Sequence, residues 1–424
     1  MIRHKFMWPW MIAAIGFVAL VAAAGFRATP GALVEPLHRE FGWSNGTIGF
    51  AMSVNLALYG VTAPFAAALM ERFGVRKVTA SAMALIALGS GLTVFMTASW
   101  QLVMLWGVMV GLGAGAISLG FVATIGTRWF VKQQGLVTGL LSAGGATGSL
   151  VFLPLVAKLS EAPGGWRTAA IVVAVVAFST VPLVLLFFRE HPADVGIPPY
   201  GADEIVPAPP AVNNAARLAI DGLKSAARTK AFWFLAMAFA ICGATSNGLV
   251  NTHFIPAAHD HGMPTVTAAG LLALIGIFDL IGTVLSGWLS DRYDSRILLL
   301  AYYALRGVSL LVLPQLFSEQ VTGFMLVFVI FYGLDFIATV PPTVALCREY
   351  FGMSAPIVFG WIFAAHQLGA AFAATAAGLT RDGFGSYAPA WYVAGALSIG
   401  AAFMSVSMKR PAPEKTLLQE PAVV

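Results

Sequence analysis

The feature that most constrains this chain is a series of long apolar runs separated by short polar loops. A helix needs ~20 apolar residues to cross a hydrocarbon core of ~30 Å, and twelve runs come close to that length. The runs lie at 8–28, 46–70, 78–97, 100–127, 133–157, 167–188, 231–255, 265–289, 297–316, 320–345, 355–379 and 388–408. Backbone polar groups in lipid must bond within the spanning structure. The sequence therefore predicts an all-α integral membrane protein with twelve transmembrane helices.

Composition argues against a soluble domain. Of the 424 residues, 58% are hydrophobic and only 10% are charged, which is more apolar surface than a soluble fold can hide. The two cysteines, Cys242 and Cys347, lie within or at the edge of spans on different helices and are interpreted as small apolar fillers. We therefore expect no disulfide framework, no metal and no cofactor, and no soluble domain that would suit a receptor or scaffold.

Lysine and arginine predict the orientation. An even number of spans puts both termini on one side of the membrane. If that side is the inner one, inner segments hold 18 of these residues and outer segments hold four. We therefore expect both termini in the cytoplasm. We also expect the protein to be a monomer in a bacterial inner membrane. The charge is spread over several loops, so nucleic acid is not an expected partner.

A charged motif occurs twice at a fixed offset. Residues 71–76 align with residues 291–296 at an offset of 220, with acid, Arg, aromatic and second Arg in register. The sequence therefore predicts two halves built on one plan. The expected units are an N-terminal six-helix bundle (1–189), a cytoplasmic linker (190–229), a C-terminal six-helix bundle (230–410) and a cytoplasmic tail (411–424). In the linker, a short amphipathic helix is expected to lie on the inner membrane surface. A gating or structural role is expected for the motif residues Glu71, Arg72, Arg76, Asp291, Arg292 and Arg296.

Four charged residues, Arg27, Asp279, Arg306 and Asp335, lie inside predicted spans. Each costs ~2.5–3.5 kcal/mol at a helix centre unless it is paired, hydrated or neutralised. Arg306 is expected to pair with Asp279 or Asp335 on the flanking helices. For Asp335, the sequence leaves two roles open: pairing with Arg306, or taking up and releasing a proton.

Asp279 begins a polar stripe. Thr283, Ser286 and Ser290 follow it at helical spacings of 4, 3 and 4. A helix that faces only lipid or a dry core has no need of such a stripe, whereas a water-accessible path does. We therefore predict a proton-coupling role for Asp279, against the alternative of a static ion pair.

Arg27 is the expected anchor for an anionic substrate, because its planar, forked donors suit a carboxylate. His366 fits either a proton relay or a satisfied hydrogen-bonding group. The candidates for binding substrate are Arg27, Tyr59, Asn247, Asn251, Thr283 and His366.

These features together resemble the major facilitator superfamily. The resemblance rests on the twelve spans, the division into six and six, and the duplicated loops ERFGVRK and SDRYDSR. Trp129–Lys132 and the small-residue pattern through Gly148 resemble the fifth-helix signature of its monocarboxylate and oxalate/formate-type porters, and Asp279 matches the eighth-helix acid. The family arginine four residues later is Thr283 here, and Gly31 stands where the family has a first-helix lysine, so Arg27 is the expected replacement.

The resemblance implies alternating access, in which two six-helix bundles rock about a central site lined by helices 1, 4, 7 and 10. The expected function is secondary transport of a small, monocarboxylate-like organic anion with a proton. The alternative is anion exchange or efflux of a neutral or amphipathic compound. Enzyme activity is not expected: Gly333–Asp335 is only a fragment of an intramembrane aspartyl protease motif, and the duplicated loops have no place in that architecture.

Overall fold

The computed structural model describes residues 2–43, 45–160, 165–206 and 214–408. Within these ranges the regular structure is helical, apart from one isolated bridge between Phe130 and Tyr200. The side chain of Arg27 and the predicted tail 411–424 lie outside the described residues.

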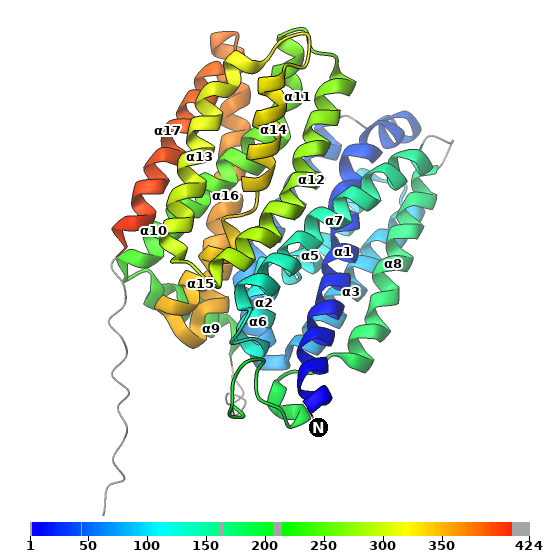
Figure 1. Ribbon diagram of the computed structural model, residues 1–424. Helices are drawn as coiled ribbons and strands as arrows, with labels where there is room; N and C mark the ends of the chain where they lie inside the picture. The colour runs from blue at the N-terminus through cyan, green and yellow to red at the C-terminus, as the bar shows by residue number, and fades with distance from the viewer. Residues whose placement is uncertain (1, 44, 161–164, 207–213, 409–424) are drawn as a thin grey trace, which may run out of the picture.

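The first half of the chain forms one bundle of long helices, blue to green in Figure 1. Its fourth crossing is assembled from consecutive shorter helices, one of which is a π-helix. The five other crossings are α1 (Ile2–Phe41), α2 (Asn45–Phe73), α3 (Val75–Leu92), α7 (Gln134–Ser160) and α8 (Gly165–Phe187). The pieces of the fourth are α4 (Ser99–Leu102), η2 (Val103–Val110), α5 (Gly111–Ala116) and α6 (Leu119–Trp129).

The second half forms the other bundle, green to red in Figure 1. Its first crossing contains a π-helical segment, and its fourth is broken in the middle. The first crossing consists of α10 (Lys230–Gly243), η4 (Ala244–Val250) and α11 (Asn251–Asp260). The others are α12 (Thr265–Ser290), α13 (Ser295–Leu316), the broken pair α14 (Gly323–Asp335) and α15 (Val340–Phe351), α16 (Ala355–Phe384) and α17 (Ala388–Ser407).

Within the described residues, eleven stretches are long and apolar enough to cross a membrane. The longest, Gly323–Arg381, runs for 59 residues and contains α14, α15 and α16, which is enough chain for two crossings. This confirms the all-α fold with twelve crossings in two bundles.

Small residues bring the helices into backbone contact. A Cβ on Gly111 would lie 3.1 Å from the Cα of Asn55, and one on Gly115 would lie 2.9 Å from the carbonyl oxygen of Tyr59. Lipid removes most of the hydrophobic drive for helices to associate, so close van der Waals packing takes its place. The regularly spaced glycines of the fourth crossing therefore serve packing.

The two copies of the charged motif join α2 to α3 and α12 to α13. We call the end of the molecule that carries both copies the linker end, because residues 188–206 and 214–229 also lie there. Equivalent residues form different pairs. Glu71 binds Arg128 at 2.6 Å, whereas its equivalent Asp291 accepts the backbone N–H groups of Gly135 and Leu136 at 2.7 and 2.9 Å.

Helix α9 (Ala215–Ala226) is the short helix predicted in the linker. Its apolar side, with Ala215 and Ala219 buried, packs against Ala67 and Ala68 of α2 and Ile357 of α16. The indole Nε1 of Trp361 donates to the Ala219 carbonyl at 2.9 Å. The helix therefore covers a seam between the two halves of the chain, and its apolar side meets protein where the sequence pattern indicated lipid.

Candidate functional site: buried charges at a broken helix

The break between α14 and α15 organises the intramembrane charges. Residues 336–339 leave the helical path, and α15 resumes with Pro341 and Pro342 in its first turn. A proline ring is compatible with the start of a helix but not with its interior, because it lacks an N–H and clashes with the preceding turn. Non-helical backbone at membrane depth needs partners from surrounding protein.

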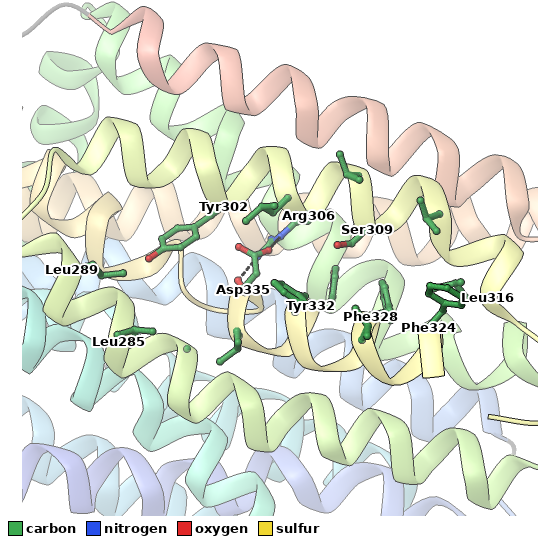
Figure 2. A pocket seen from close by; sticks show the side chains of 17 residues that line it. Leu285, Leu289, Tyr302, Arg306, Ser309, Leu316, Phe324, Phe328, Tyr332 and Asp335 are labelled. Carbon is green, nitrogen blue, oxygen red and sulfur yellow. Dashed lines mark hydrogen bonds and ion pairs between the residues drawn. The ribbon is translucent and has the colours of Figure 1, made fainter. Parts of the chain in front are cut away.

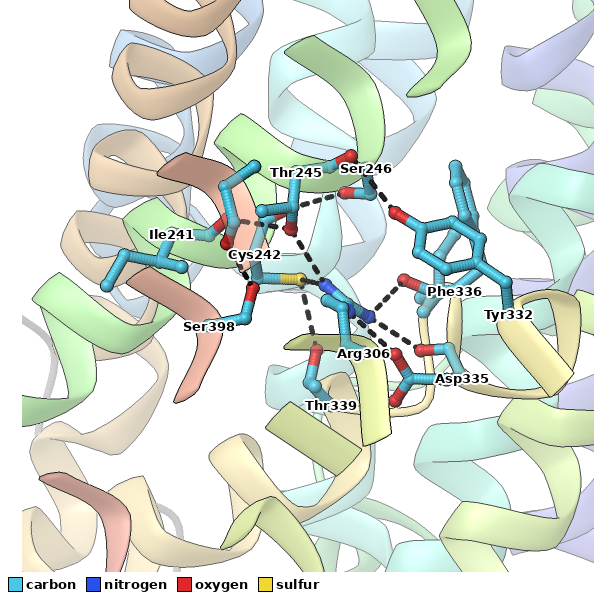
Figure 3. A network of polar contacts seen from close by, with 12 residues as sticks. Ile241, Cys242, Thr245, Ser246, Arg306, Tyr332, Asp335, Phe336, Thr339 and Ser398 are labelled. Carbon is cyan, nitrogen blue, oxygen red and sulfur yellow. Dashed lines mark hydrogen bonds and ion pairs between the residues drawn. The ribbon is translucent and has the colours of Figure 1, made fainter. Parts of the chain in front are cut away.

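Arg306 of α13 supplies one set of partners (Figure 3). Its Nη2 donates to the carbonyl oxygens of Asp335 and Phe336 at 2.7 and 3.0 Å, and its Nε donates to Asp335 Oδ2 at 2.6 Å. The last carbonyls of a helix have no intrahelical donor and carry partial negative charge, so a cation there is stabilising. Arg306 therefore caps the carboxyl end of α14 and also neutralises the charge of Asp335, the last residue of that helix.

The remaining donors of Arg306 are also occupied. Its Nη1 donates to the Cys242 sulfur at 3.0 Å and to Thr245 Oγ1 at 3.4 Å. The Arg306 and Asp335 side chains are 0% and 8% exposed. A guanidinium has five N–H donors, and these five contacts account for all of them. The Arg306–Asp335 pair is thus a dry crosslink among α13, α14 and the first crossing of this half.

Asp279 of α12 approaches the break from the opposite side. Its Oδ1 accepts the backbone N–H of Ile337 at 3.0 Å and the Thr283 hydroxyl at 2.9 Å. Ser286 Oγ donates to the Ala338 carbonyl at 2.5 Å. The stripe that begins at Asp279 therefore binds the unwound backbone.

The prediction that this stripe lines a water-accessible path is wrong for the conformation of this structure. Asp279, Thr283 and Ser286 are only 3%, 0% and 1% exposed. The physical reason is that the unwound segment supplies the polar partners that the sequence pattern assigned to water. Periodicity showed that one face of α12 needed such partners, but it did not show which kind.

The other predicted site residues lie in two places. Asn251 Nδ2 donates to Asn247 Oδ1 at 3.1 Å, where η4 meets α11. Tyr59 meets the Phe363 ring edge-on and His366 stacks on it, with ring centroids 5.3 and 5.8 Å from that ring. Tyr59 and His366 are buried, at 6% and 7% exposure, so these ring contacts join α2 to α16.

Sequence reasoning missed the role of Cys242. Its sulfur accepts from Arg306 and lies 3.2 Å from Thr339 Oγ1, so the interpretation as an apolar filler was wrong. Tyr332, whose hydroxyl donates to the Thr245 carbonyl at 3.0 Å, was missed as well. The sequence held one signal for the role of Cys242: Thr245 follows it by one helical turn, so a polar side chain lies on the same face of the helix. In the described part of the chain, His, Cys, Asp and Glu side chains do not form a group that could hold a metal.

Asp291 of the second charged motif joins the two halves at the linker end. Its Oδ1 and Oδ2 accept the backbone N–H groups of Gly135 and Leu136 at 2.7 and 2.9 Å. N–H groups in the first turn of a helix such as α7 have no partner within the helix, and a negative charge is stabilised there. Arg348 of α15 adds bonds to the Gln134 side chain and, at 3.3 Å, to the Phe130 carbonyl. Both residues thus connect the second half to the start of α7.

The first motif makes contacts within its own half. Arg72 lies over Phe73, and Arg292 of the second copy similarly lies over Trp288, at 4.8 and 3.9 Å from the ring centroids. The Arg76 backbone N–H donates to Glu190 at 3.4 Å.

Glu190 and His191 lie close to the pair formed by Glu71 and Arg128. Burial raises the pKa of the Glu190 carboxyl above its ordinary value. Burial and the nearby Arg128 charge lower the pKa of His191. The first motif therefore adjoins two groups whose charge depends on pH.

Comparisons with known proteins agree with this architecture. Among solved structures, the xylose symporter described as the major facilitator superfamily proton:xylose symporter XylE bound to 6-bromo-6-deoxy-D-glucose matches with a TM-score of 0.72 at 16% identity, covering 95% of this chain and 96% of that one. The transporter FucP in the outward conformation matches with a TM-score of 0.68 at 16% identity, covering 94% and 99%. At these identities the likeness shows the fold, with its two pseudo-symmetric six-helix bundles.

Sequence relatives are transporters as well. The chain is 26% identical to monocarboxylate transporter 13 of Bos taurus over 95% of its own length and 89% of the relative's. It is 24% identical to the uncharacterized MFS-type transporter YcxA of Bacillus subtilis (strain 168), over 88% of each chain. The family model of the Major Facilitator Superfamily matches residues 15–355 and 240–422. The chain therefore belongs to the major facilitator superfamily of membrane transporters.

Proposed function

We propose that this transporter carries a small, monocarboxylate-like organic anion together with a proton, by alternating access between its two bundles. Two kinds of similarity support the proposal. Relatives that match nearly the whole chain are named monocarboxylate transporters, and proteins of the same fold are named proton symporters.

The observation that carries the proton part is the bond from Ile337 N–H to Asp279. A buried carboxylate is costly to leave charged, so a proton arriving at Asp279 lowers the cost of its burial. A neutral carboxyl is also a weaker acceptor than a carboxylate. Protonation of Asp279 would therefore loosen the hold of α12 on the α14–α15 break and couple proton uptake to movement of the tenth crossing. We keep Asp335 as a second proton-coupling candidate, although its pairing with Arg306 favours a structural role.

The anion part rests on Arg27. Arg306 has no free N–H for a substrate, because all of its donors bind Asp335, Phe336, Cys242 and Thr245. Of the two arginines that the sequence places within spans, Arg27 is therefore the proposed carboxylate anchor. Tyr59, Asn247, Asn251 and His366 are proposed as further substrate contacts, and Thr283 as the residue that positions Asp279.

We also propose that the linker end faces the cytoplasm and that this structure is closed on that side. The support is the distribution of contacts between the halves. Asp291 binds the start of α7, Phe65 packs on Trp361 with ring centroids 5.7 Å apart, and α9 covers that seam. Opening toward the cytoplasm would have to separate all three contacts.

Uptake into proteoliposomes tests the proposal. Purified protein is reconstituted, and labelled lactate, pyruvate, formate and oxalate are offered with and without an imposed proton gradient. We expect gradient-driven accumulation of at least one acid. Asp279→Asn should abolish that accumulation and retain counterflow, because exchange of substrate needs no net proton movement. Asp260→Asn is the matched control, since Asp260 pairs with Arg381 in a partly exposed bridge away from the break.

Two results would refute parts of this proposal. If Asp279→Asn accumulates substrate as well as the parent, the proton role of Asp279 is wrong. If uptake of every acid is the same with and without the imposed proton gradient, exchange or efflux replaces proton symport. Arg27→Gln should raise the KM for the anion, and an unchanged KM would remove Arg27 from the site.

A further inference from the structure

A groove of about 420 Å³ lies between α12, α13 and α14 of the second bundle (Figure 2). Its walls are aliphatic and aromatic, with Leu305, Val308 and Phe331 among them. These three side chains are 55%, 55% and 57% exposed, so the protein alone does not cover them. The groove lies within membrane-spanning helices, where the surrounding medium is hydrocarbon. Its size is in the range of small-molecule sites.

The inner end of the groove is polar, with Tyr302, Arg306 and Asp335 on its lining (Figure 2). The Asp335 side chain is 8% exposed, and its Oδ2 binds Arg306. Its other oxygen, Oδ1, is buried and has no hydrogen-bond partner among the described residues. A buried acceptor without a donor is unfavourable and calls for a partner. An occupant of the groove that carries a donor would satisfy it.

The same contacts define the charge of that occupant. The five N–H donors of Arg306 are all engaged with protein groups, so an anionic head group would find no free N–H on Arg306. It would instead meet the Asp335 carboxylate, which accepts and does not donate when ionised. A neutral hydroxyl can donate to Oδ1 without desolvating a charge of its own. The head group that fits is therefore a neutral alcohol.

We propose that this groove is a binding site, reached from within the bilayer, for a single-chain neutral amphiphile such as a long-chain alcohol or monoacylglycerol. The chain lies along the apolar walls, and the hydroxyl donates to Asp335 Oδ1. The exposed walls of the groove belong to the outer faces of α13 and α14, and the site shares only Asp335, the second proton-coupling candidate, with the proposed transport path.

Photolabelling in reconstituted bilayers tests the site. The probe is dodecanol with a diazirine in mid-chain, and the comparison probes are the matched alkane and the matched carboxylate. All three are used at equal bilayer concentration, and labelled peptides are mapped by mass spectrometry. We expect the alcohol to label α13 and α14 about fivefold more than either comparison probe, as one net hydrogen bond would produce. Unlabelled monoolein should compete for this labelling.

Paired valine variants locate the site. Val308→Trp fills the groove, whereas Val393→Trp places the same bulk on α17, where the parent valine is similarly exposed at 59%. Labelling of α13 and α14 should fall in the first variant and persist in the second. The double variant Arg306→Met/Asp335→Leu should lose the preference for the alcohol while the alkane still labels the groove.

The proposal fails on either of two results. Labelling spread evenly over lipid-facing helices, and unchanged by Val308→Trp, would show ordinary annular contact with lipid. Equal labelling by the carboxylate would show that Asp335 Oδ1 does not select a neutral donor. Neither readout depends on transport activity.

Discussion

Replacing Asp335 with leucine should destabilise the protein strongly, because it leaves the Arg306 guanidinium charged and buried. The pair is 2.6 Å long, and its side chains are 0% and 8% exposed. Removing one partner of such a pair costs about 3–5 kcal/mol, since the remaining charge has lost its compensation. Arg306 keeps its two bonds to the carbonyls of Asp335 and Phe336 in this variant, because those accept through the backbone.

Arg306→Met should cost more near neutral pH, and its cost should depend on pH. It removes the same ion pair and both carbonyl bonds, and hydrogen bonds to a charged group contribute about 1.5–3 kcal/mol each. The carboxyl left behind can take up a proton, whereas a guanidinium does not lose its proton in proteins. Lowering the pH should therefore restore part of the stability of Arg306→Met and none of that of Asp335→Leu.

The double variant Arg306→Met/Asp335→Leu separates charge from capping. It buries no charge, so it should be more stable than Arg306→Met. It still removes the Arg306 donor from the Phe336 carbonyl, at about 1–3 kcal/mol, and leaves the Asp335 carbonyl with the Ala338 N–H at 3.2 Å, so it should remain below the parent.

Thermal unfolding in detergent, followed by intrinsic tryptophan fluorescence, measures these effects. A loss of 3–5 kcal/mol corresponds to a fall in melting temperature on the order of 10 °C. Asp221→Ala is the control, because its pair with Arg217 on α9 is 56% and 80% exposed and should contribute at most ~1 kcal/mol. The reasoning is refuted if Asp335→Leu melts with the parent, or if both single variants respond alike to pH.

Three further predictions concern the contact of α7 with α12 and the linker end. Asp291→Ala should weaken the closed seam by about 1–2 kcal/mol, which is the value of a helix N-terminal cap. Cysteines introduced at the start of α7 should then react faster with a water-soluble maleimide. Unchanged reactivity would contradict this prediction. Gly139→Val should prevent close packing of α7 on α12, because its Cβ would lie 2.6 Å from the Thr283 carbonyl oxygen. Both the counterflow rate and the melting temperature of this variant should be lower than those of the parent. Parent-like values of both would disprove this contact. Burial raises the pKa of Glu190 above its ordinary 4.5, so the folded state binds this proton more tightly than the unfolded state and stability from this group falls as pH rises above 4.5. Glu190→Gln should remove that fall from melting curves recorded across pH, and the slope would stay unchanged if the carboxyl were not responsible.

The sequence by itself determined the fold class, because the signals for it are local. Run length and hydropathy depend on residues within one helix, so all twelve crossings could be predicted and α14–α15 was recognised as one span despite its break. The repeated motif at residues 71–76 and 291–296 indicated two related halves. The cost of burying charge singled out Asp279, Arg306 and Asp335 as residues that needed an explanation.

Only the tertiary structure decided what those charges do, because their partners are distant in the chain. Arg306 meets Asp335 across 29 residues, Asp279 meets Ile337 across 58, and Asp291 meets Gly135 across 156. A helical stripe shows that one face of α12 needs polar partners, but water and an unwound backbone satisfy that need equally well. The unwound segment before α15, whose first turn holds Pro341 and Pro342, decides between them, because its polar groups can bond to Asp279 and Arg306 but not to lipid.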